Sequence, residues 1–506
     1  MKFLRLIHLT VILALLAACA PSGETPSATS APTSSLPTPV VNVTSMPDIR
    51  ATFEAFVTAW RADDYAAMYA MLSAASQQAI SQDDFVARYK DAMNTMSLRQ
   101  LDYSILATNT TPKSADVTFR VVYRTYIAGD IEREMTARWL NEGGQWKLDW
   151  SETLILPELA GGKKLVMDYQ IPLRGNIYDK DGNPIVAEDE VYAIGLQPGN
   201  IVPEQEETLL REMARIAGST PEDIAASYRF AQPNWYIPVG EASIGEIQNR
   251  LGLISGLGGV LLTQYRSRYY YAGGLAPHIV GYVISVPAEE FDSYKRRGYS
   301  GAEKVGYSGI EKWGEEILGG KRGGRLYVLN PDGTIGAALG QSGQVPGSSI
   351  YLTLQSDFQR QVQDALKGLT GAVVVIERDT GRVLAMAASP SFDPNLFEGQ
   401  NPNRQILGQV LSNPANPLLN RATQSTYPLG SVFKIITMAA ALESGDFTAE
   451  STYDCQYEFT ELGSPILYDW TWERYQRELA ATGEGKTKPS GLLTLPEGLM
   501  RSCNPW

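Results

Sequence analysis

The sequence predicts a multidomain α+β protein, because the pattern of its apolar residues changes several times along 506 residues. A chain of this length usually contains about three domains. Apolar residues first recur at helical spacing, from Phe53 to Leu72, and then alternate with polar residues, from Val117 to Arg124. Helices followed by antiparallel strands are typical of the α+β class.

The composition excludes several classes of function. The net charge of −13 argues against binding to nucleic acid. The two histidines, His8 and His278, and the scattered cysteines form no pattern for a zinc site. The glycines lie in turn-like contexts and form no phosphate-binding loop. We therefore expect neither a metal nor an organic cofactor.

Residues 1–19 have the features of an export signal. Lys2 and Arg5 precede an uncharged, mostly apolar run that extends from Leu6 to Ala20. This run is shorter than the roughly 20 residues that a membrane-spanning helix needs. It contains the sequence LAAC at 16–19, which resembles the lipobox of bacterial lipoproteins; the alternative is an ordinary signal peptide. The resemblance implies that Cys19 is lipidated and holds the protein on the extracytoplasmic face of the cell membrane.

Residues 20–46 are rich in Ser, Thr, Pro and Ala and carry almost no charge. Such a segment cannot bury enough apolar surface to offset its ordering entropy, so we expect a flexible tether.

Residues 47–158 have a globular composition. Two strand-like runs, Glu132–Leu140 and Gln145–Leu154, are joined by the hairpin sequence NEGG. The whole segment, which closes with WKLDWS at 146–151, resembles the nuclear-transport-factor-like N-terminal domain of methicillin-resistance-type penicillin-binding proteins. Its polar residues do not converge on one point, so we expect a spacer domain, not a ligand-binding one.

Residues 160–325 contain three short motifs in a fixed order. The first, RGNIYDKDGNPIVA at 174–187, predicts a strand, an Asp-Gly turn and a second strand. The others are RYYYAGGLAPHIVGY at 268–282 and GYSGIE at 306–311. Together they resemble the dimerisation or pedestal domain of class B penicillin-binding proteins. Their residues are expected to be structural: buried Arg and Glu tie loops together, and His278 is packed and hydrogen-bonded, not catalytic.

Residues 345–506 contain the residues that carry chemistry. Their opening predicts a β-hairpin, from Gly371–Glu377 to Arg382–Ala388, around the turn at 379–381. The run from Thr353 to Asn395, which contains this hairpin, resembles the opening of the penicillin-binding transpeptidase domain, which implies a serine β-lactamase-like α/β fold.

The first chemical motif is the pair Ser431 and Lys434, at the start of the apolar run Ile435–Leu442. A helix N-terminus favours the negative charge that develops on a nucleophilic oxygen. A lysine in a partly desolvated pocket loses its proton more easily and can activate a serine as its base. A bare S-x-x-K also occurs on solvated helices, where the serine does nothing. The surrounding sequence NRATQSTYPLGSVFK at 420–434 resembles the family pattern Y-x-P-G-S-x-F-K, although Leu429 replaces its proline.

The second motif is Ser502-Cys503-Asn504, which follows a capping box formed by Thr494 and Glu497. On an extended loop, Ser502 and Asn504 would face the same side and Cys503 the other. The motif resembles the family's S-x-N. The resemblance implies that Ser502 relays a proton between Lys434 and the leaving amine, and that Asn504 holds a substrate amide. Cys503 can pair with Cys455, but we expect two buried thiols.

The family's third motif, K-T-G, does not occur after Asn504. The nearest substitute, GKTK at 485–488, precedes S-x-N and has no glycine after its threonine. We therefore expect a transpeptidase domain that is truncated at Trp506, with an open sheet edge and an exposed core.

The resemblance implies a peptidoglycan D,D-transpeptidase. Ser431 would be acylated by one stem peptide and would pass the acyl group to an amine of another, and β-lactams would acylate Ser431 as substrate mimics. The implied partners are stem peptides, β-lactam antibiotics, the membrane through the lipid anchor, and other wall-synthesis proteins. Two alternatives remain: a non-catalytic wall-synthesis scaffold, and a β-lactamase or β-lactam sensor. The sequence leaves open whether the role is in elongation, division or antibiotic resistance.

Overall fold

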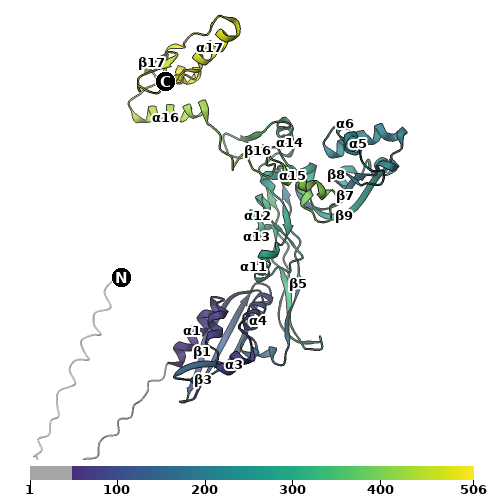
Figure 1. The fold of residues 1–506 in the computed structure, drawn as a ribbon, viewed down its shortest axis with the longest axis vertical. Helices are drawn as coiled ribbons and strands as arrows, with labels where there is room; N and C mark the ends of the chain where they lie inside the picture. The colour runs from purple at the N-terminus through teal and green to yellow at the C-terminus, as the bar shows by residue number, and fades with distance from the viewer. Residues whose placement is uncertain (1–47) are drawn as a thin grey trace, which may run out of the picture.

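The computed structural model describes residues 48–506, so the expected signal peptide, Cys19 and the tether lie outside the described residues. An N-terminal domain, a narrow neck, a head and a C-terminal lobe follow one another along the long axis of the molecule (Figure 1). Within residues 48–506, none of the helices combines the length and the apolar character needed to cross a membrane. Since distinct domains with mixed helices and sheets are present, the predicted α+β multidomain architecture is confirmed.

The N-terminal domain packs four helices against an antiparallel sheet of order β1-β2-β3-β4. Its helices are α1 (Ile49–Arg61), α2 (Tyr65–Ala70), α3 (Ala74–Ala79) and α4 (Gln82–Thr95), and its strands are β1 (Leu98–Thr110), β2 (Ser114–Thr125), β3 (Asp130–Glu142) and β4 (Gln145–Asp149). The predicted helical stripes and the hairpin between β3 and β4 are confirmed. The strand expected over Gln145–Leu154 is too long, because the chain leaves the sheet at Asp149 and turns through Glu152–Leu154.

Aromatic side chains fill the interior of this domain. The rings of Phe53 and Phe119 lie 4.7 Å apart, which joins α1 to β2. Trp60 meets Tyr89 edge to face at 5.3 Å, which joins α1 to α4. Such pairs contribute beyond the burial of apolar area, so the domain has a core of its own.

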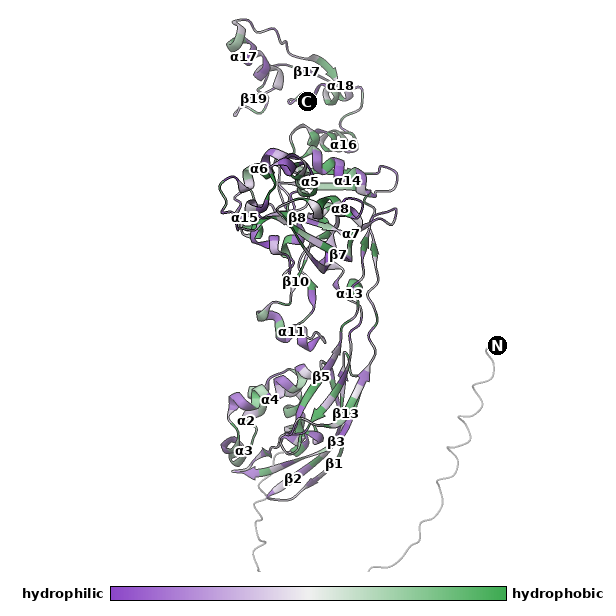
Figure 2. Ribbon diagram, turned by 90° about the vertical axis from the view of Figure 1, so that its right-hand side faces the viewer, coloured by the Kyte–Doolittle hydropathy of each residue, from purple (hydrophilic) through white to green (hydrophobic). Residues whose placement is uncertain are grey.

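The neck and the head are built on two sheets. The neck sheet has the order β13-β12-β5, and the head sheet has the order β14-β6-β7-β8, with β9 paired to β7. Figure 2 shows the long neck strands running from the N-terminal domain towards the head. The strands are β5 (Lys164–Gln170), β6 (Ile177–Tyr178), β7 (Pro184–Leu196), β8 (Ile237–Ser243), β9 (Val260–Tyr270), β12 (Gly323–Leu329), β13 (Ile335–Ser342) and β14 (Ile350–Tyr351), with a separate pair, β10 (Val283–Ser285) and β11 (Lys304–Gly306).

Nine helices of the neck and head surround these sheets in the described chain. They are α5 (Glu206–Ala217), α6 (Pro221–Tyr228), α7 (Ile244–Ile247), α8 (Leu251–Gly256), α9 (Tyr271–Gly274), α10 (Pro277–Val280), α11 (Phe291–Arg296), α12 (Gly309–Trp313) and α13 (Glu315–Leu318). The Asp-Gly turn predicted between β6 and β7 is present, and Gly182 has φ of +85° there. That left-handed conformation favours glycine.

The expected ties between buried Arg and Glu are confirmed in the neck. The carboxylate of Glu311, which is fully buried, accepts hydrogen bonds from Arg174 and Arg268. Arg174 also pairs with Glu315 at 2.7 Å. His278 is packed as predicted: its Nε2 lies 2.7 Å from the carbonyl oxygen of Pro417, and burial lowers the pKa of the ring.

The C-terminal part divides into a segment packed on the head and a separate lobe (Figure 1). The first segment contains α14 (Ser356–Ala365), the hairpin β15 (Gly371–Ile376) and β16 (Val383–Ser389), and α15 (Leu407–Ser412). The lobe contains α16 (Lys434–Ser444), β17 (Thr452–Cys455), β18 (Glu458–Phe459), β19 (Leu467–Tyr468), α17 (Trp470–Thr482), β20 (Gly491–Thr494) and α18 (Leu495–Arg501).

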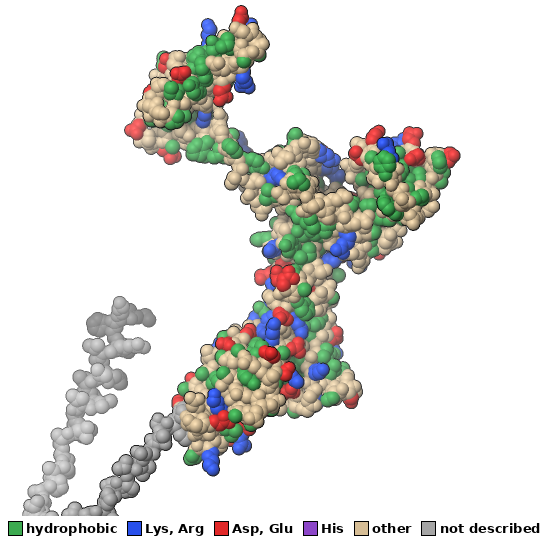
Figure 3. All heavy atoms as spheres, in the orientation of Figure 1, with side chains coloured by type: hydrophobic (Ala, Val, Ile, Leu, Met, Phe, Trp, Pro, Cys, Tyr) green, Lys and Arg blue, Asp and Glu red, His purple; other side chains and the backbone are tan. Residues whose placement is uncertain are grey.

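Apolar side chains stand exposed on both parts, and Figure 3 shows them as green atoms on the lobe. Ile376 on β15 is 58% exposed, and Ile435 on α16 is 61% exposed. The hairpin pairs with no further strand among the described residues.

Candidate active site

The residues of the two motifs meet in the C-terminal lobe. Ser431 lies in the 3-10 turn Gly430–Phe433, which runs directly into α16, and Lys434 is the first residue of that helix. Ser502 follows the last residue of α18. The hydroxyl of Ser502 donates to Ser431 Oγ at 2.7 Å, so the two motifs, 71 residues apart, are in direct contact.

Lys434 forms hydrogen bonds with both residues of the second motif, Ser502 and Asn504. Its ammonium donates to Ser502 Oγ at 3.2 Å, to the carbonyl oxygen of Ser502 at 2.7 Å and to Asn504 Oδ1 at 2.7 Å. Partial burial lowers the pKa of Lys434, and the negative charge of Asp469 opposes that effect. A continuous path of hydrogen bonds therefore runs from Ser431 through Ser502 to Lys434.

The sequence suggested that Ser502 lies on an extended loop, but the structure shows otherwise. Ser502 terminates α18 in the left-handed conformation, with φ of +55°. The chain turns at this residue, and the side chains of Ser502 and Asn504 both reach Lys434 all the same. The sequence reasoning was therefore correct about the convergence and wrong about the backbone that produces it.

The helix that delivers Ser502 begins with the predicted capping box. The Glu497 carboxylate accepts hydrogen bonds from the backbone N–H and from the hydroxyl of Thr494, both at 2.9 Å. An equivalent box, Thr220 with Asp223, starts α6 in the distant head. The two boxes provide a matched pair for experiment.

We expect Thr494→Ala to lower the free energy of unfolding by about 1 kcal/mol, because the helix loses its cap. Thr220→Ala is expected to cost about as much. The sequence resemblance implies that Ser431 reacts with a penicillin; only Thr494→Ala is then expected to slow that reaction, measured with a fluorescent penicillin. Equal slowing in both variants would mean that global stability, not the placement of α18, controls the site.

Asn504 is held on three sides. Its Oδ1 accepts from Lys434, its Nδ2 donates to the carbonyl oxygen of Tyr468 at 3.0 Å, and its backbone N–H donates to Asp469 Oδ2 at 2.9 Å. Asp469 is completely buried. Sequence reasoning missed Asp469; the available signal was its position as the N-cap of the helix that begins at Trp470.

The expectation of two buried thiols is wrong, because Cys455 and Cys503 form a disulfide. Strand β17 and the turn after α18 bring the two Cα atoms within 6.3 Å, which is in the range for a disulfide. The cysteines are separated by 48 positions in the sequence, and nothing in that spacing indicated that they lie close together. Cys503 is buried, as expected, and packs with Leu493 in a small core cluster of the lobe.

A cavity of about 470 Å³ borders the site between α16 and α18. Its lining is mainly apolar and includes Met438, Phe447, Leu499 and Trp506, while Lys434 and Asn504 lie at its edge. The reacting groups are thus placed where a polar cluster meets an apolar hollow.

Three family models match consecutive parts of the chain. The NTF2-like N-terminal transpeptidase domain matches residues 49–163, the penicillin-binding protein dimerisation domain matches 169–352, and the penicillin-binding protein transpeptidase domain matches 371–504. The last match includes all four motif residues that converge in the lobe, which are Ser431, Lys434, Ser502 and Asn504.

Named relatives are similar to this chain over part of their length. The chain is 27% identical over 408 residues to Penicillin-binding protein 3 of Bacillus subtilis, covering 78% of this chain and 60% of that protein. It is 31% identical over 294 residues to peptidoglycan D,D-transpeptidase MrdA of Escherichia coli, covering 56% of this chain and 45% of that protein. The chain therefore spans about half the length of these relatives. A solved complex of a penicillin-binding protein (PBP2) and MreC from Helicobacter pylori matches at 22% identity with a TM-score of 0.43, covering 66% of this chain and 60% of that one.

Proposed function

Since this chain belongs to the class B penicillin-binding proteins, we propose that it is a peptidoglycan D,D-transpeptidase acting through an acyl-enzyme on Ser431. The observation that carries the proposal is the path of hydrogen bonds from Ser431 Oγ through Ser502 Oγ to Lys434 Nζ. A serine hydroxyl is a weak nucleophile unless a base can accept its proton. Here the base is Lys434, which is connected to the nucleophile Ser431 by two hydrogen bonds through Ser502.

In the first half of the proposed reaction, Ser431 Oγ attacks the penultimate D-Ala carbonyl carbon of a stem peptide. The Ser431 proton moves through Ser502 to neutral Lys434 as the new C–O bond forms. The peptide C–N bond then breaks, and the proton returns through Ser502 to the departing D-Ala amine. In the second half, an amine of a neighbouring stem peptide attacks the ester and loses its proton along the same path, so Ser431 is regenerated.

Asn504 is suited to hold the substrate while this happens. An amide side chain has two N–H donors and two oxygen lone pairs. Asn504 uses one N–H on Tyr468 and one lone pair on Lys434, and its side chain is exposed. One donor and one acceptor therefore remain for an amide of the stem peptide, with the side chain already oriented.

β-Lactams would acylate Ser431 because they present a reactive amide where the stem peptide presents the D-Ala bond. We further propose that the protein works on the extracytoplasmic face of the membrane through a lipid on Cys19. The lipobox at 16–19 supports that placement.

The test is intact mass spectrometry of the 506-residue chain after incubation with a penicillin, followed by peptide mapping. We expect one penicillin per chain, attached to Ser431 and released slowly. Rapid loss of the adduct with accumulation of hydrolysed penicillin would identify a β-lactamase instead. A folded protein that forms no adduct would contradict the proposal and favour a scaffold role.

A further inference from the structure

Behind the motif residues lies a buried carboxylate for which the reaction above has no use. Asp469 is 0% exposed and divides its two oxygens between two tasks. Its Oδ1 caps α17 by accepting from Thr471 N at 3.0 Å and from Thr471 Oγ1 at 2.5 Å. Its Oδ2 accepts from the backbone N–H of Asn504 at 2.9 Å. A carboxylate that only capped a helix would not need its second oxygen buried against the S-x-N motif.

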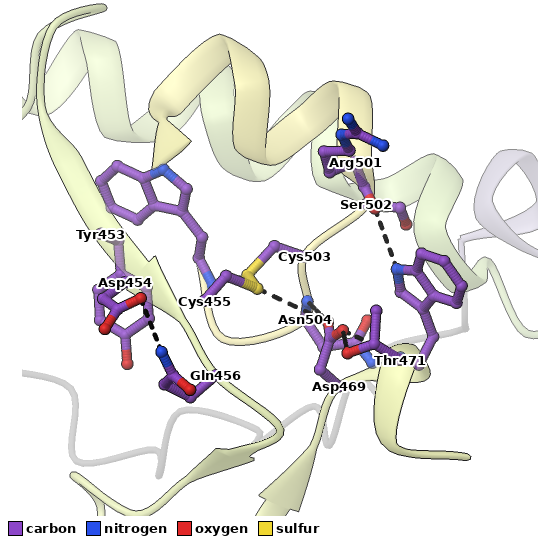
Figure 4. The surroundings of a disulfide bond; sticks show 12 residues. Tyr453, Asp454, Cys455, Gln456, Asp469, Thr471, Arg501, Ser502, Cys503 and Asn504 are labelled. Carbon is purple, nitrogen blue, oxygen red and sulfur yellow. Dashed lines mark hydrogen bonds between the residues drawn. A yellow bond between two sulfur atoms is a disulfide. The ribbon is translucent and has the colours of Figure 1, made fainter. Parts of the chain in front are cut away.

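The disulfide is a second contact that holds the segment Ser502–Asn504. Cys503 stands between Ser502 and Asn504, and its partner Cys455 ends β17. Figure 4 shows Asp469, Thr471 and Asn504 gathered beside the two sulfurs. The sulfur of Cys455 lies 3.8 Å from Asp469 Oδ2, so the disulfide and the carboxylate form one buried cluster.

Strand β17 holds the helix before the motif at both ends. Thr452, at the start of β17, pairs with Thr494, which caps α18. Cys455, at the end of β17, is joined to Cys503 just beyond the C-terminus of α18. The helix that carries Ser502 is therefore fixed between two points of a single strand.

The motif needs such support because its backbone is strained. Ser502 adopts φ of +55°, a conformation that non-glycine residues rarely take. Strained conformations of this kind persist only when the surrounding structure determines them. The contacts made by Asn504 N and by Cys503 are the ones that fix the chain directly after this residue.

We propose that Asp469 and the Cys455–Cys503 disulfide form a brace that positions Ser502 and Asn504 against Lys434, which makes Asp469 a positioning residue for acylation. The proposal rests on the proposed function, because acylation of Ser431 is the step that the brace serves. Asp469 acts through Asn504 and through its charge, and it does not contact Ser431. Its charge also attracts the Lys434 ammonium, which opposes the effect of burial on the pKa of that lysine.

The test compares Asp469→Ser, Asp469→Asn and the double variant Cys455→Ala/Cys503→Ala with the parent chain. Serine is as good an N-cap as aspartate, so Asp469→Ser keeps α17 capped and removes both the acceptor for Asn504 and the negative charge. Asparagine keeps the shape and removes the charge. Asp64→Ser is the matched control, because Asp64 caps α2 of the N-terminal domain by accepting from Ala67 N.

We expect acylation by a fluorescent penicillin to slow by about tenfold to a hundredfold in the Asp469 and cysteine variants, since small displacements of reacting groups cost this much. Asp64→Ser should react like the parent. The pH profile adds a readout that a loss of stability would not move. Removing the Asp469 charge lowers the pKa of Lys434, so the acid limb of the profile shifts to lower pH in Asp469→Asn and not in the cysteine variant.

Parent-like rates and profiles in the folded Asp469 and cysteine variants would overturn the brace. Hydrogen exchange at the Asn504 amide provides a second measurement, which does not depend on acylation. We expect this amide to exchange at least about tenfold faster in Asp469→Ser than in the parent, because its acceptor is gone. If the parent is not acylated, the proposed function fails, and only hydrogen exchange at the Asn504 amide then tests whether the brace exists. Equal exchange rates in the parent and in Asp469→Ser would overturn the brace.

Discussion

Ser431→Ala is expected to form no penicillin adduct, and Lys434→Met is expected to form one about a thousandfold more slowly than the parent, within the range for loss of a general base. Methionine has nearly the length of lysine and no basic nitrogen, so the path from Ser431 ends at Ser502. The rates follow from intact mass sampled over time. Parent-like acylation of Lys434→Met would remove the lysine from the mechanism.

The same base predicts how acylation depends on pH. Only neutral Lys434 can accept the Ser431 proton, so the rate rises as pH increases through the lysine pKa. Burial lowers that pKa from its ordinary value of about 10.4. We therefore expect the acid limb of the profile to lie below that value. A flat profile from neutral to alkaline pH would show that proton transfer to Lys434 does not limit acylation.

Much of the site could be predicted because its chemistry depends on local spacing. Ser431 and Lys434 are three residues apart at a helix start, and the turn and helix of the structure place them as expected. Thr494 and Glu497 also form their box within one turn. Helical periodicity and capping are properties of a few consecutive residues, so the sequence alone determines them.

The remaining features depend on contacts between distant segments. The disulfide joins residues 48 apart, and Asp469 meets Asn504 across 35 residues. No periodic pattern in the sequence relates the two residues of either pair. Two cysteines in isolation are compatible with thiols or with a bridge, and only the pairing of β17 with β20 decides between them. The left-handed turn at Ser502 was missed for a similar reason, since serine has no special preference for that conformation.

Glu311→Gln is expected to cause the largest loss of stability, about 3–5 kcal/mol, because it leaves buried positive charge without its counter-charge. Glu311 is 0% exposed, and its carboxylate faces Arg174 at 2.8 Å on one side and Arg268 on the other. Arg174 keeps Glu315 as a partner in the variant, but Arg268, which is 3% exposed, loses its carboxylate. Glu316, which is exposed, provides the control Glu316→Gln, with an expected change within about 0.5 kcal/mol.

Calorimetry is the suitable measurement for Glu311→Gln, since a multidomain chain does not unfold in two states and the affected transition must be resolved. The double variant Arg268→Met/Glu311→Met separates charge from packing. Removing a buried charge together with its partner is often close to neutral, whereas removing one partner is costly. We therefore expect the double variant to recover part of the lost stability. If it instead loses more than Glu311→Gln, the neck depends on the shape and hydrogen bonds of these side chains, and not on the balance of their charges.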